Sequence, residues 1–409
     1  MENNSLKIVN IYPLLEEKYK FKFRHKKKYE KIKATKIIKL ILILILLIII
    51  IYIIFRYNQY LKISSLIKEF LNVNENSINK GNRRRIGVIG ILNDQNPGNN
   101  LIKFSMYTKL KEFGFDPFII AKIRKNNDIY FLKKMVKLKI INDTFSELNE
   151  NDYDYIMLNS DQSWTRSTLS QVDKIAFLKF AENWTIPKFI YAASTDANYW
   201  MLTKRENEEG KRLLKNFKGI SFREEYIKIL AEQNLDIKAE FVLDPTFLID
   251  KNYYLDLIKD YKRNFNFNEK YILVYQLDRN INIEIFIQKV IKMFNYKIYN
   301  ISIDDKNYIE NFIFGINISQ CVVTDSYHGT VFSIIFNKPF VSFGNKRRGI
   351  GRFESLKKTF NIKNRFITPF SNYNDIINAL SEPLNINQTL LEELKDKSIK
   401  FLKSCLDIN

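Results

Sequence analysis

The sequence contains few residues of the kinds that hold metals or form disulfides. Its 409 residues include two cysteines, Cys321 and Cys405, and two histidines, His25 and His328. Two isolated cysteines provide neither a disulfide framework nor the ligand spacing of a metal site. A structural zinc site needs several of these residues close together. We therefore expect a protein without a metal site and without a disulfide framework.

Acidic residues are outnumbered, and the imbalance is local. The chain has 65 lysines and arginines against 45 acidic residues, which gives a net charge of +20. Residues 1–85 hold 19 basic and 6 acidic residues, so most of the excess lies near the N-terminus. Residues 86–409, with 46 basic and 39 acidic residues, show no motif of interleaved basic and aromatic residues. A nucleic-acid partner is therefore not expected.

Charged side chains are absent from residues 40–55, a run of Leu, Ile, Tyr and Phe. Extended back to residue 37, this run approaches the length of about 20 residues that crosses a bilayer as a helix. Lys39 can reach the lipid headgroups from within the segment. No small-residue cleavage site follows, so residues 37–56 are predicted to be an uncleaved transmembrane signal anchor in the lipid bilayer. A buried core helix would fit less well with so unbroken an apolar run.

The charges on either side of this segment predict its orientation. Basic residues are dense in the tail of residues 1–36, whereas only Arg56, Lys62 and Lys68 follow closely. The positive-inside rule predicts a single-pass membrane protein with a cytoplasmic N-terminus and a lumenal or extracytoplasmic main domain. Residues 57–85, which include a polar patch, are expected to form a stem or linker.

From residue 86 onward, short apolar runs alternate with helical patterns. Such alternation predicts an α/β fold built on parallel sheets. Residues 86–260 are expected to form an N-terminal Rossmann-like half, and residues 261–409 a C-terminal Rossmann-like half with a final helix that packs back on the first half. The predicted strands are 86–92, 118–121, 155–158, 189–193, 219–222, 241–243, 271–275, 297–301, 321–323 and 339–343. Predicted helices include 101–113, 283–294 and 390–406.

Polar clusters directly follow four of the predicted strands. They are residues 159–164, 194–196, 223–225 and 244–246. In an open α/β sheet, ligands bind beyond the carboxyl ends of the strands. We therefore expect these clusters to lie together at one edge of the sheet and to face a ligand.

A fifth predicted strand leads to His328, the one histidine within residues 86–409. The apolar strand 321–323 runs into the turn Asp325-Ser326-Tyr327-His328, and a helix is expected from Gly329. A helix N-terminus offers unpaired amides and a positive pole, which suit a phosphate. His328 could donate to a phosphate oxygen or transfer a proton near neutral pH. The alternative is an ordinary capping or core histidine.

Several strings occur in the order in which one known family has them. They are Asn159-Ser160-Asp161-Gln162-Ser163-Trp164, Tyr191-Ala192-Ala193-Ser194, Ser221-Phe222-Arg223-Glu224, Leu243-Asp244-Pro245-Thr246, Thr324-Asp325-Ser326-Tyr327-His328-Gly329-Thr330 and Arg348-Gly349-Ile350-Gly351-Arg352-Phe353. Together they resemble the polysaccharide pyruvyl transferase family over about residues 86–385, and residues 98–100 are similar to its first motif. Ser326 stands where some members have arginine, and Asn159 where glycine is usual.

The resemblance implies a GT-B-like architecture with a cleft between two Rossmann-like halves. It also implies transfer of the enolpyruvyl unit of phosphoenolpyruvate, the donor substrate, to sugar hydroxyls of a glycan acceptor. The products would be a pyruvate ketal and free phosphate, and no metal or cofactor is implied. Two other functions remain open: a GT-B glycosyltransferase that uses a nucleotide sugar, and a catalytically silent member that binds a glycan. The sequence leaves the oligomeric state open.

Roles for individual residues follow from the resemblance and from their chemistry. His328 is expected to protonate the donor or to neutralise the departing phosphate, and Asp161 to orient or deprotonate the acceptor hydroxyl. The expected donor-binding residues are Arg223, Ser326, Gly329, Thr330, Arg348 and Arg352. The expected acceptor-binding residues are Asn99, Gln162, Trp164 and Tyr327.

Most of these residues have a structural alternative. Arg223 could pair with one of the two glutamates that follow it, and Asp161 could cap a helix. Residues 344–353 are expected to form a flexible cationic loop, on which Arg348 and Arg352 either close on the phosphate or stay solvated. The aromatic residues of the acceptor set could be core residues instead of rings that stack on a sugar.

Overall fold

The computed structural model describes residues 83–409 apart from 91–95, 123–128, 142–143, 170–174, 262–267 and 302–306, together with residues 42, 44–52, 54 and 55. The chain divides into two compact units, Met1–Gly81 and Asn82–Asn409. In the first unit the described residues are helical and exposed. No helix within the described ranges is both long and apolar enough to span a bilayer. The basic tail, most of the stem and part of the predicted anchor at 37–56 lie outside these ranges, and the anchor stays a prediction.

The larger sheet of the second unit has seven parallel strands within the described residues, in the order β3-β2-β1-β4-β5-β6-β7. Its strands are β1 (Arg85–Ile89), β2 (Asp116–Lys122), β3 (Leu138–Ile141), β4 (Tyr155–Asp161), β5 (Lys188–Ala193), β6 (Gly219–Phe222) and β7 (Glu240–Phe241). The strand order reverses between β1 and β4, and such a reversal opens a ligand crevice at the carboxyl ends of the strands.

The smaller sheet has four parallel strands within the described residues, in the order β11-β10-β8-β9. They are β8 (Tyr271–Tyr275), β9 (Lys297–Asn300), β10 (Cys321–Thr324) and β11 (Phe340–Ser342). Here the order reverses between β8 and β10. The unit is therefore an α/β structure with two parallel sheets, as the alternation of patterns predicted.

Helices cover the sheets on both faces, because the strands bury side chains in both directions. In β4, for example, Met157 belongs to one hydrophobic core while Ile156 and Leu158 belong to another. The helices are α2 (Pro97–Glu112), α3 (Ile129–Met135), α4 (Arg166–Leu169), α5 (Lys204–Leu214), α6 (Glu225–Leu235), α7 (Lys251–Leu257), α8 (Ile281–Phe294), α9 (Tyr308–Ile318), α10 (Tyr327–Ile335), α11 (Ile350–Phe360), α12 (Tyr373–Ser381) and α13 (Gln388–Cys405). Short 3-10 helices are η1 (Phe145–Glu147), η2 (Glu150–Asp152), η3 (Ile175–Phe177), η4 (Lys179–Ala181), η5 (Pro245–Phe247), η6 (Lys346–Arg348) and η7 (Lys363–Arg365).

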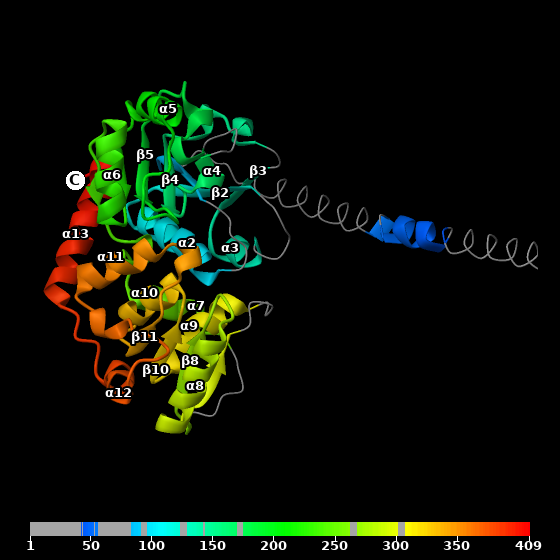
Figure 1. Ribbon diagram of the computed structural model, residues 1–409. Helices are drawn as coiled ribbons and strands as arrows, with labels where there is room; N and C mark the ends of the chain where they lie inside the picture. The colour runs from blue at the N-terminus through cyan, green and yellow to red at the C-terminus, as the bar shows by residue number, and fades with distance from the viewer. Residues whose placement is uncertain are drawn as a thin grey trace, which may run out of the picture. The chain divides into compact units, whose positions relative to one another are not determined.

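The last helix, α13, drawn in red in Figure 1, returns to the larger sheet, where Lys397 pairs with Glu240 of β7. The hydroxyl of Ser398 accepts a hydrogen bond from the backbone N–H of Leu243 at 2.9 Å. Phe401 packs against the start of β6, where Gly219 leaves room for its ring. The helix therefore links the end of the chain to the N-terminal half.

Several helices begin two to four residues earlier than the sequence predicted, α2 and α10 among them. Asn96 caps α2 by accepting a hydrogen bond from the N–H of Gly98 at 3.0 Å, so this helix starts at Pro97. Ser326 caps α10 in the same way, so Tyr327 and His328 belong to the helix and not to a preceding turn. The strand β3 was not predicted, because lysines interrupt its short apolar pattern.

Candidate functional site

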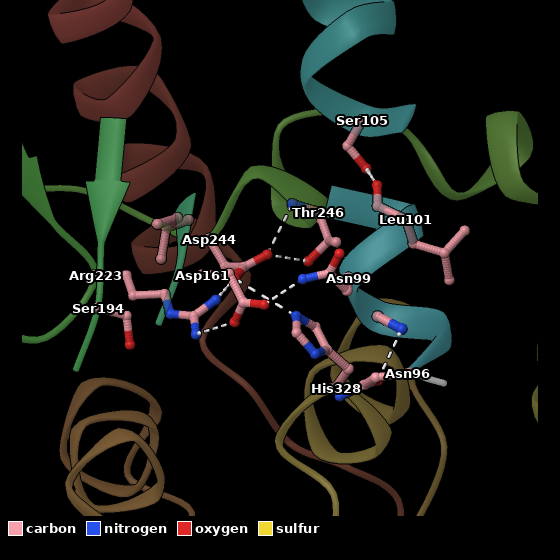
Figure 2. Close-up of polar contacts among 12 residues, drawn as sticks. Asn96, Asn99, Leu101, Ser105, Asp161, Ser194, Arg223, Asp244, Thr246 and His328 are labelled. Carbon is pink, nitrogen blue, oxygen red and sulfur yellow. Dashed lines mark hydrogen bonds and ion pairs between the residues drawn. The ribbon is translucent and has the colours of Figure 1, made fainter. Parts of the chain in front are cut away.

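Residues from both halves meet at the carboxyl ends of the two sheets. In the first half, Asp161 ends β4, Arg223 follows β6 and Asp244 follows β7. In the second half, α10 follows β10 and carries His328 in its first turn. Figure 2 shows these four side chains pointing toward one another. The parallel strands thus gather the polar clusters at one edge, as the sequence predicted.

Arg223 is held by three carboxylates. Its Nη1 donates to Asp244 Oδ2 at 2.5 Å, its Nη2 to Asp161 Oδ1 at 3.3 Å and its Nε to Glu224 Oε1 at 3.3 Å. Its guanidinium carbon lies 4.6 Å from the centroid of the Tyr327 ring. Burial disfavours the charged guanidinium, but Tyr327 and the carboxylates outweigh burial and raise the pKa of Arg223. The ion pairing expected as an alternative is therefore present, and the protein itself neutralises Arg223.

A second guanidinium, that of Arg352, lies against the same ring, 5.0 Å from the centroid of Tyr327. Its Nη2 donates to the backbone carbonyl of Arg348, and within the described residues its Nε has no hydrogen-bond partner. Burial and the charge of Arg223 lower the pKa of Arg352. Since a buried cation is stable only when an anion or acceptors satisfy it, Arg352 is the better placed of the two arginines to bind an anionic ligand.

His328 is 1% exposed and lies in polar surroundings. Its Nε2 is 3.8 Å from Asp244 Oδ2, which is too long for a hydrogen bond, and neither ring nitrogen finds a hydrogen-bond partner in the described part of the chain. The ring lies edge-on to Tyr327 and directly against Gly98 at the start of α2. The N-termini of α2 and α10 therefore both lie beside His328, and their positive poles favour an anion.

The turn into α10 is shaped by small residues. The hydroxyl of Ser326 accepts a hydrogen bond from the N–H of Gly329 at 3.2 Å. A Cβ on Gly329 would lie 2.3 Å from Thr324 Oγ1, so only glycine fits there. The hydroxyl of Thr330 donates to Ser342 Oγ at 2.9 Å. Ser326, Gly329 and Thr330 thus build the turn, and direct binding of the donor by them stays a prediction.

Asp161 has a strained backbone, with φ at +98°, a value that residues other than glycine seldom adopt. Its carboxylate accepts hydrogen bonds from Asn99 and Arg223, and the side chain of Asn99 in turn accepts one from Lys103. Burial favours the neutral acid, but Arg223 and other nearby cations lower the pKa of Asp161 to about 2. The group is therefore ionised at neutral pH, and it does not cap a helix, since α4 begins only at Arg166.

Glu224 was considered from the sequence only as a partner for Arg223. It is fully buried, and its Oε1 accepts a hydrogen bond from Ser194 Oγ at 2.7 Å as well as one from Arg223. Its Oε2 has no hydrogen-bond partner among the described residues. Burial raises the pKa of Glu224 to about 7, although Arg223 and Ser194 act in the opposite direction.

Gln162 and Arg348 join the two halves. The side-chain amide of Gln162 donates to the backbone carbonyl of Arg348 at 2.9 Å. The guanidinium of Arg348 is partly exposed and binds both carboxylate oxygens of Asp278 at 2.9 Å, within the second half. Their predicted contacts with acceptor and donor stay predictions, and within the described residues neither side chain hydrogen-bonds to Arg223 or to its carboxylate partners.

The segment around Arg348 differs from the flexible loop that the sequence suggested. Asn345 caps η6 by accepting a hydrogen bond from the N–H of Arg347 at 3.1 Å. Gly349, with φ at +92°, then turns the chain into α11. Arg352 therefore lies on a helix and is buried, not solvated. The prediction of a loop was wrong because the glycines serve a tight turn and a close packing contact.

The two aromatic residues of the predicted acceptor set have different surroundings. Trp164 is 2% exposed, packs edge-on against Phe177 and Phe222, and donates from its indole nitrogen to the carbonyl of Ala176 at 3.1 Å. It is therefore a core residue, and its position gives no support to sugar stacking. Tyr327 is also buried, but it contacts Arg223 and Arg352 within the site, as described above.

A family model for polysaccharide pyruvyl transferases matches residues 87–347. This chain belongs to the polysaccharide pyruvyl transferase family. It is thus a transferase that acts on polysaccharides, and the matched range contains every site residue named above except Arg348 and Arg352. No curated protein matches the sequence of this pyruvyl transferase.

Solved structures resemble this pyruvyl transferase only weakly. A UDP-GlcNAc 2-epimerase from Methanocaldococcus jannaschii has 13% sequence identity, covers 70% of this chain and 96% of its own, and has a TM-score of 0.42. A glycosyltransferase from Rickettsia africae has 11% identity, covers 80% of this chain and 99% of its own, and has a TM-score of 0.42. Membership of the pyruvyl transferase family therefore rests on the sequence match alone.

Proposed function

We propose that this family member transfers the enolpyruvyl unit of phosphoenolpyruvate to hydroxyls of a glycan, and that residues 37–56 anchor it in a membrane. One observation carries the choice of donor. A buried guanidinium without a carboxylate partner, Arg352, and an unpaired imidazole, His328, lie around one aromatic ring, Tyr327, within the described residues. Phosphoenolpyruvate brings a phosphate and a carboxylate, the two groups that such a site lacks.

Phosphate and carboxylate would occupy different parts of the site. The N-termini of α2 and α10 suit the phosphate, because their amides and positive poles lie beside His328. Arg352 suits the carboxylate, because a guanidinium can bind both carboxylate oxygens. The side chains of Arg223, Tyr327, His328 and Arg352 are all buried where the halves touch. The donor could reach them only when the halves separate, as in other enzymes whose domains close around a ligand.

The reaction forms a ketal in two additions. In the first, C3 of the donor gains a proton while a sugar hydroxyl forms a bond to C2 and gives up its own proton. In the second, the C–O bond to phosphate breaks, and a second hydroxyl attacks C2 and loses its proton as the ketal closes. One of the two hydroxyl protons replaces the proton given to C3, and the other leaves with phosphate. His328 is the residue that could supply the proton to C3 or hold the departing phosphate.

Asp161 suits the acceptor side of this reaction. Its pKa of about 2 makes the carboxylate a weak base, so it would orient a hydroxyl by accepting its hydrogen bond. The hydrogen bond from Asn99 fixes the carboxylate, and Asn99 is fixed by Lys103. The acceptor proton would pass to the departing phosphate once the C–O bond to C2 has formed.

The experiment uses the full chain in detergent with phosphoenolpyruvate and a galactose- or mannose-bearing glycan, and it measures phosphate release. We expect release that needs both substrates and that falls by about 10²-fold or more in His328→Ala and Arg352→Met. Arg347→Met is the matched control, because Arg347 is exposed on the same segment. Turnover that requires a nucleotide sugar would show a glycosyltransferase instead. Glycan binding without turnover on any donor would show a catalytically silent member.

A further inference from the structure

The carboxylates around Arg223 do not have equivalent surroundings. Asp161 accepts a hydrogen bond on each oxygen, one from Arg223 and one from Asn99. Asp244 does the same, since Arg223 binds one oxygen and Thr246 donates twice to the other. An ionised carboxylate in a buried place needs donors on both oxygens. Both aspartates meet this requirement.

Glu224 does not meet it. Both of its hydrogen bonds, from Ser194 and Arg223, go to Oε1, while Oε2 is buried and has no partner within the described ranges. A neutral carboxylic acid, with its proton on Oε2, leaves this buried oxygen without a partner at lower cost than an ionised carboxylate would. The pKa of Glu224, raised by burial to about 7, agrees with that geometry.

The charge of Glu224 decides the charge of the cluster. The guanidiniums of Arg223 and Arg352 lie against Tyr327, and Asp161 and Asp244 are ionised beside Arg223. With Glu224 neutral, three cations (Arg223, Arg352 and the Lys103 that lies near Asp161) face two ionised aspartates, so the cluster has a net positive charge. With Glu224 ionised, three carboxylates balance the three cations, and the net positive charge that attracts an incoming anion is lost.

We propose that Glu224 is a positioning residue of the donor site, and that it must carry a proton for an anion to bind beside Arg223 and Arg352. This inference rests on the proposed function, because it takes the donor to be an anion. Neutral Glu224 still holds Arg223 through Nε, but it leaves the cluster with one uncompensated positive charge until the donor arrives. Anion binding and proton binding to Glu224 are then reciprocally linked.

Charged and titratable groups face Glu224 from several elements. They are Arg223 at the end of β6, Tyr226 on α6, Tyr327 on α10 and Arg352 on α11, with Asp161, Asp244, His328 and, on α2, Lys103 around them. His328 can also bind a proton, so it needs a separate control. The test is therefore made in both the wild-type chain and the His328→Gln background.

The experiment measures sulfate binding to the full chain by calorimetry between about pH 6 and pH 9, because sulfate keeps a constant charge over this range. For the wild type we expect affinity to fall by up to about tenfold per pH unit above the pKa of Glu224. Glu224→Gln, which is neutral at every pH, should keep its low-pH affinity within about twofold across the same range. The same contrast is expected in the His328→Gln background.

A second measurement needs no variant. Calorimetry of the wild type in buffers of different ionisation enthalpy reports protons taken up, and we expect about one proton per sulfate bound above neutral pH. Infrared difference spectra should show a protonated carboxyl appearing on sulfate addition, and Glu224→Gln should lack it.

Several results would overturn the inference. They are equal pH dependence in wild type and Glu224→Gln, no proton uptake by the wild type, no sulfate binding at any pH, or loss of sulfate binding in a folded Glu224→Gln protein. Phosphate release plays no part in these readouts. A chain that takes up a proton with sulfate but does not transfer pyruvyl groups would refute the proposed function and leave the role of Glu224 standing.

Discussion

Gly98 and His328 come from different halves of the fold and touch. A Cβ on Gly98 would lie 2.0 Å from Cγ of the His328 ring, so the imidazole lies directly on the backbone at the start of α2. This contact brings the N-termini of α2 and α10 together at the ring, which belongs to the first turn of α10. Glycine is needed at position 98 for this close approach between the halves.

Gly98→Ala should displace the His328 ring or push the halves apart. Overpacking of this kind costs about 1–3 kcal/mol of folding free energy, which urea unfolding can measure. Adding His328→Ala should restore the lost stability, because removing the ring frees the space that the new methyl group needs. Equal losses with and without the imidazole would contradict the contact.

The two arginines beside Tyr327 should respond oppositely to neutral substitution. Arg223→Met leaves Asp161 and Asp244 without their cation and should cost about 3–5 kcal/mol of stability. Arg352→Met removes a buried charge that has no carboxylate partner within the described residues, so stability should change by less than about 1 kcal/mol or rise. Urea unfolding of both variants provides the comparison. A larger loss of stability for Arg352→Met than for Arg223→Met would mean that Arg352, and not Arg223, is the arginine that the protein neutralises.

Glu224 should make stability depend on pH. Its pKa in the folded protein, about 7, is above the ordinary value of 4.5, so the unfolded chain loses this proton first. Stability from this group is therefore complete below the ordinary value and decreases as pH rises through 7, by about 3 kcal/mol in total. Glu224→Gln should flatten that decrease in thermal unfolding followed from mildly acidic to alkaline pH. If Glu224→Gln left the pH dependence of stability unchanged, that result would contradict the raised pKa of Glu224.

Asp161 should act in the opposite sense. Its pKa of about 2 is below the ordinary 3.8, so its contribution to stability is complete above the ordinary value and is lost as pH falls through 2.

Because the φ of Asp161 is +98°, Asp161→Gly should be more stable than Asp161→Ala by about 1 kcal/mol, while both lose the carboxylate. Chemical unfolding of the matched pair isolates the backbone strain from the charge. Equal stabilities would show that this backbone is unstrained.

Residues 82–409 should fold and act without the preceding segment, because they form a compact unit of their own. We expect a chain that starts at Asn82 to release phosphate at the rate of the full chain when the acceptor is soluble. Vesicle flotation should recover the full chain with membranes and the shortened chain in the soluble fraction. Flotation of both chains, or of neither, would count against anchoring by residues 37–56.

Sequence patterns predicted the sheets well because the central strands, such as β5, β8 and β10, are buried on both faces. Runs such as 155–158 and 271–275 are apolar throughout, and such runs have few other stable conformations in an α/β chain. The same patterns placed Asp161, Arg223 and Asp244 at strand ends. Since parallel strands share one carboxyl edge, their proximity could be expected before the structure was known.

The surroundings of individual charges could not be predicted in this way. The string Arg223-Glu224 does not say whether the arginine faces a ligand or the protein, because that depends on Asp161 and Asp244, which are distant in sequence. Arg352 was expected on a loop, yet α11 buries it. Trp164 was expected near the acceptor, yet it fills the core. In each case tertiary packing decided between two locally acceptable positions.

The sequence by itself determined the alternation of strands and helices, the edge of the sheets where polar residues gather, and the family to which the chain belongs. Only the tertiary structure decided which charges are neutralised and which are not. Hydrophobic periodicity is a local property that each segment carries alone, whereas the charge state of Glu224 or Arg352 depends on burial and on partners from other elements.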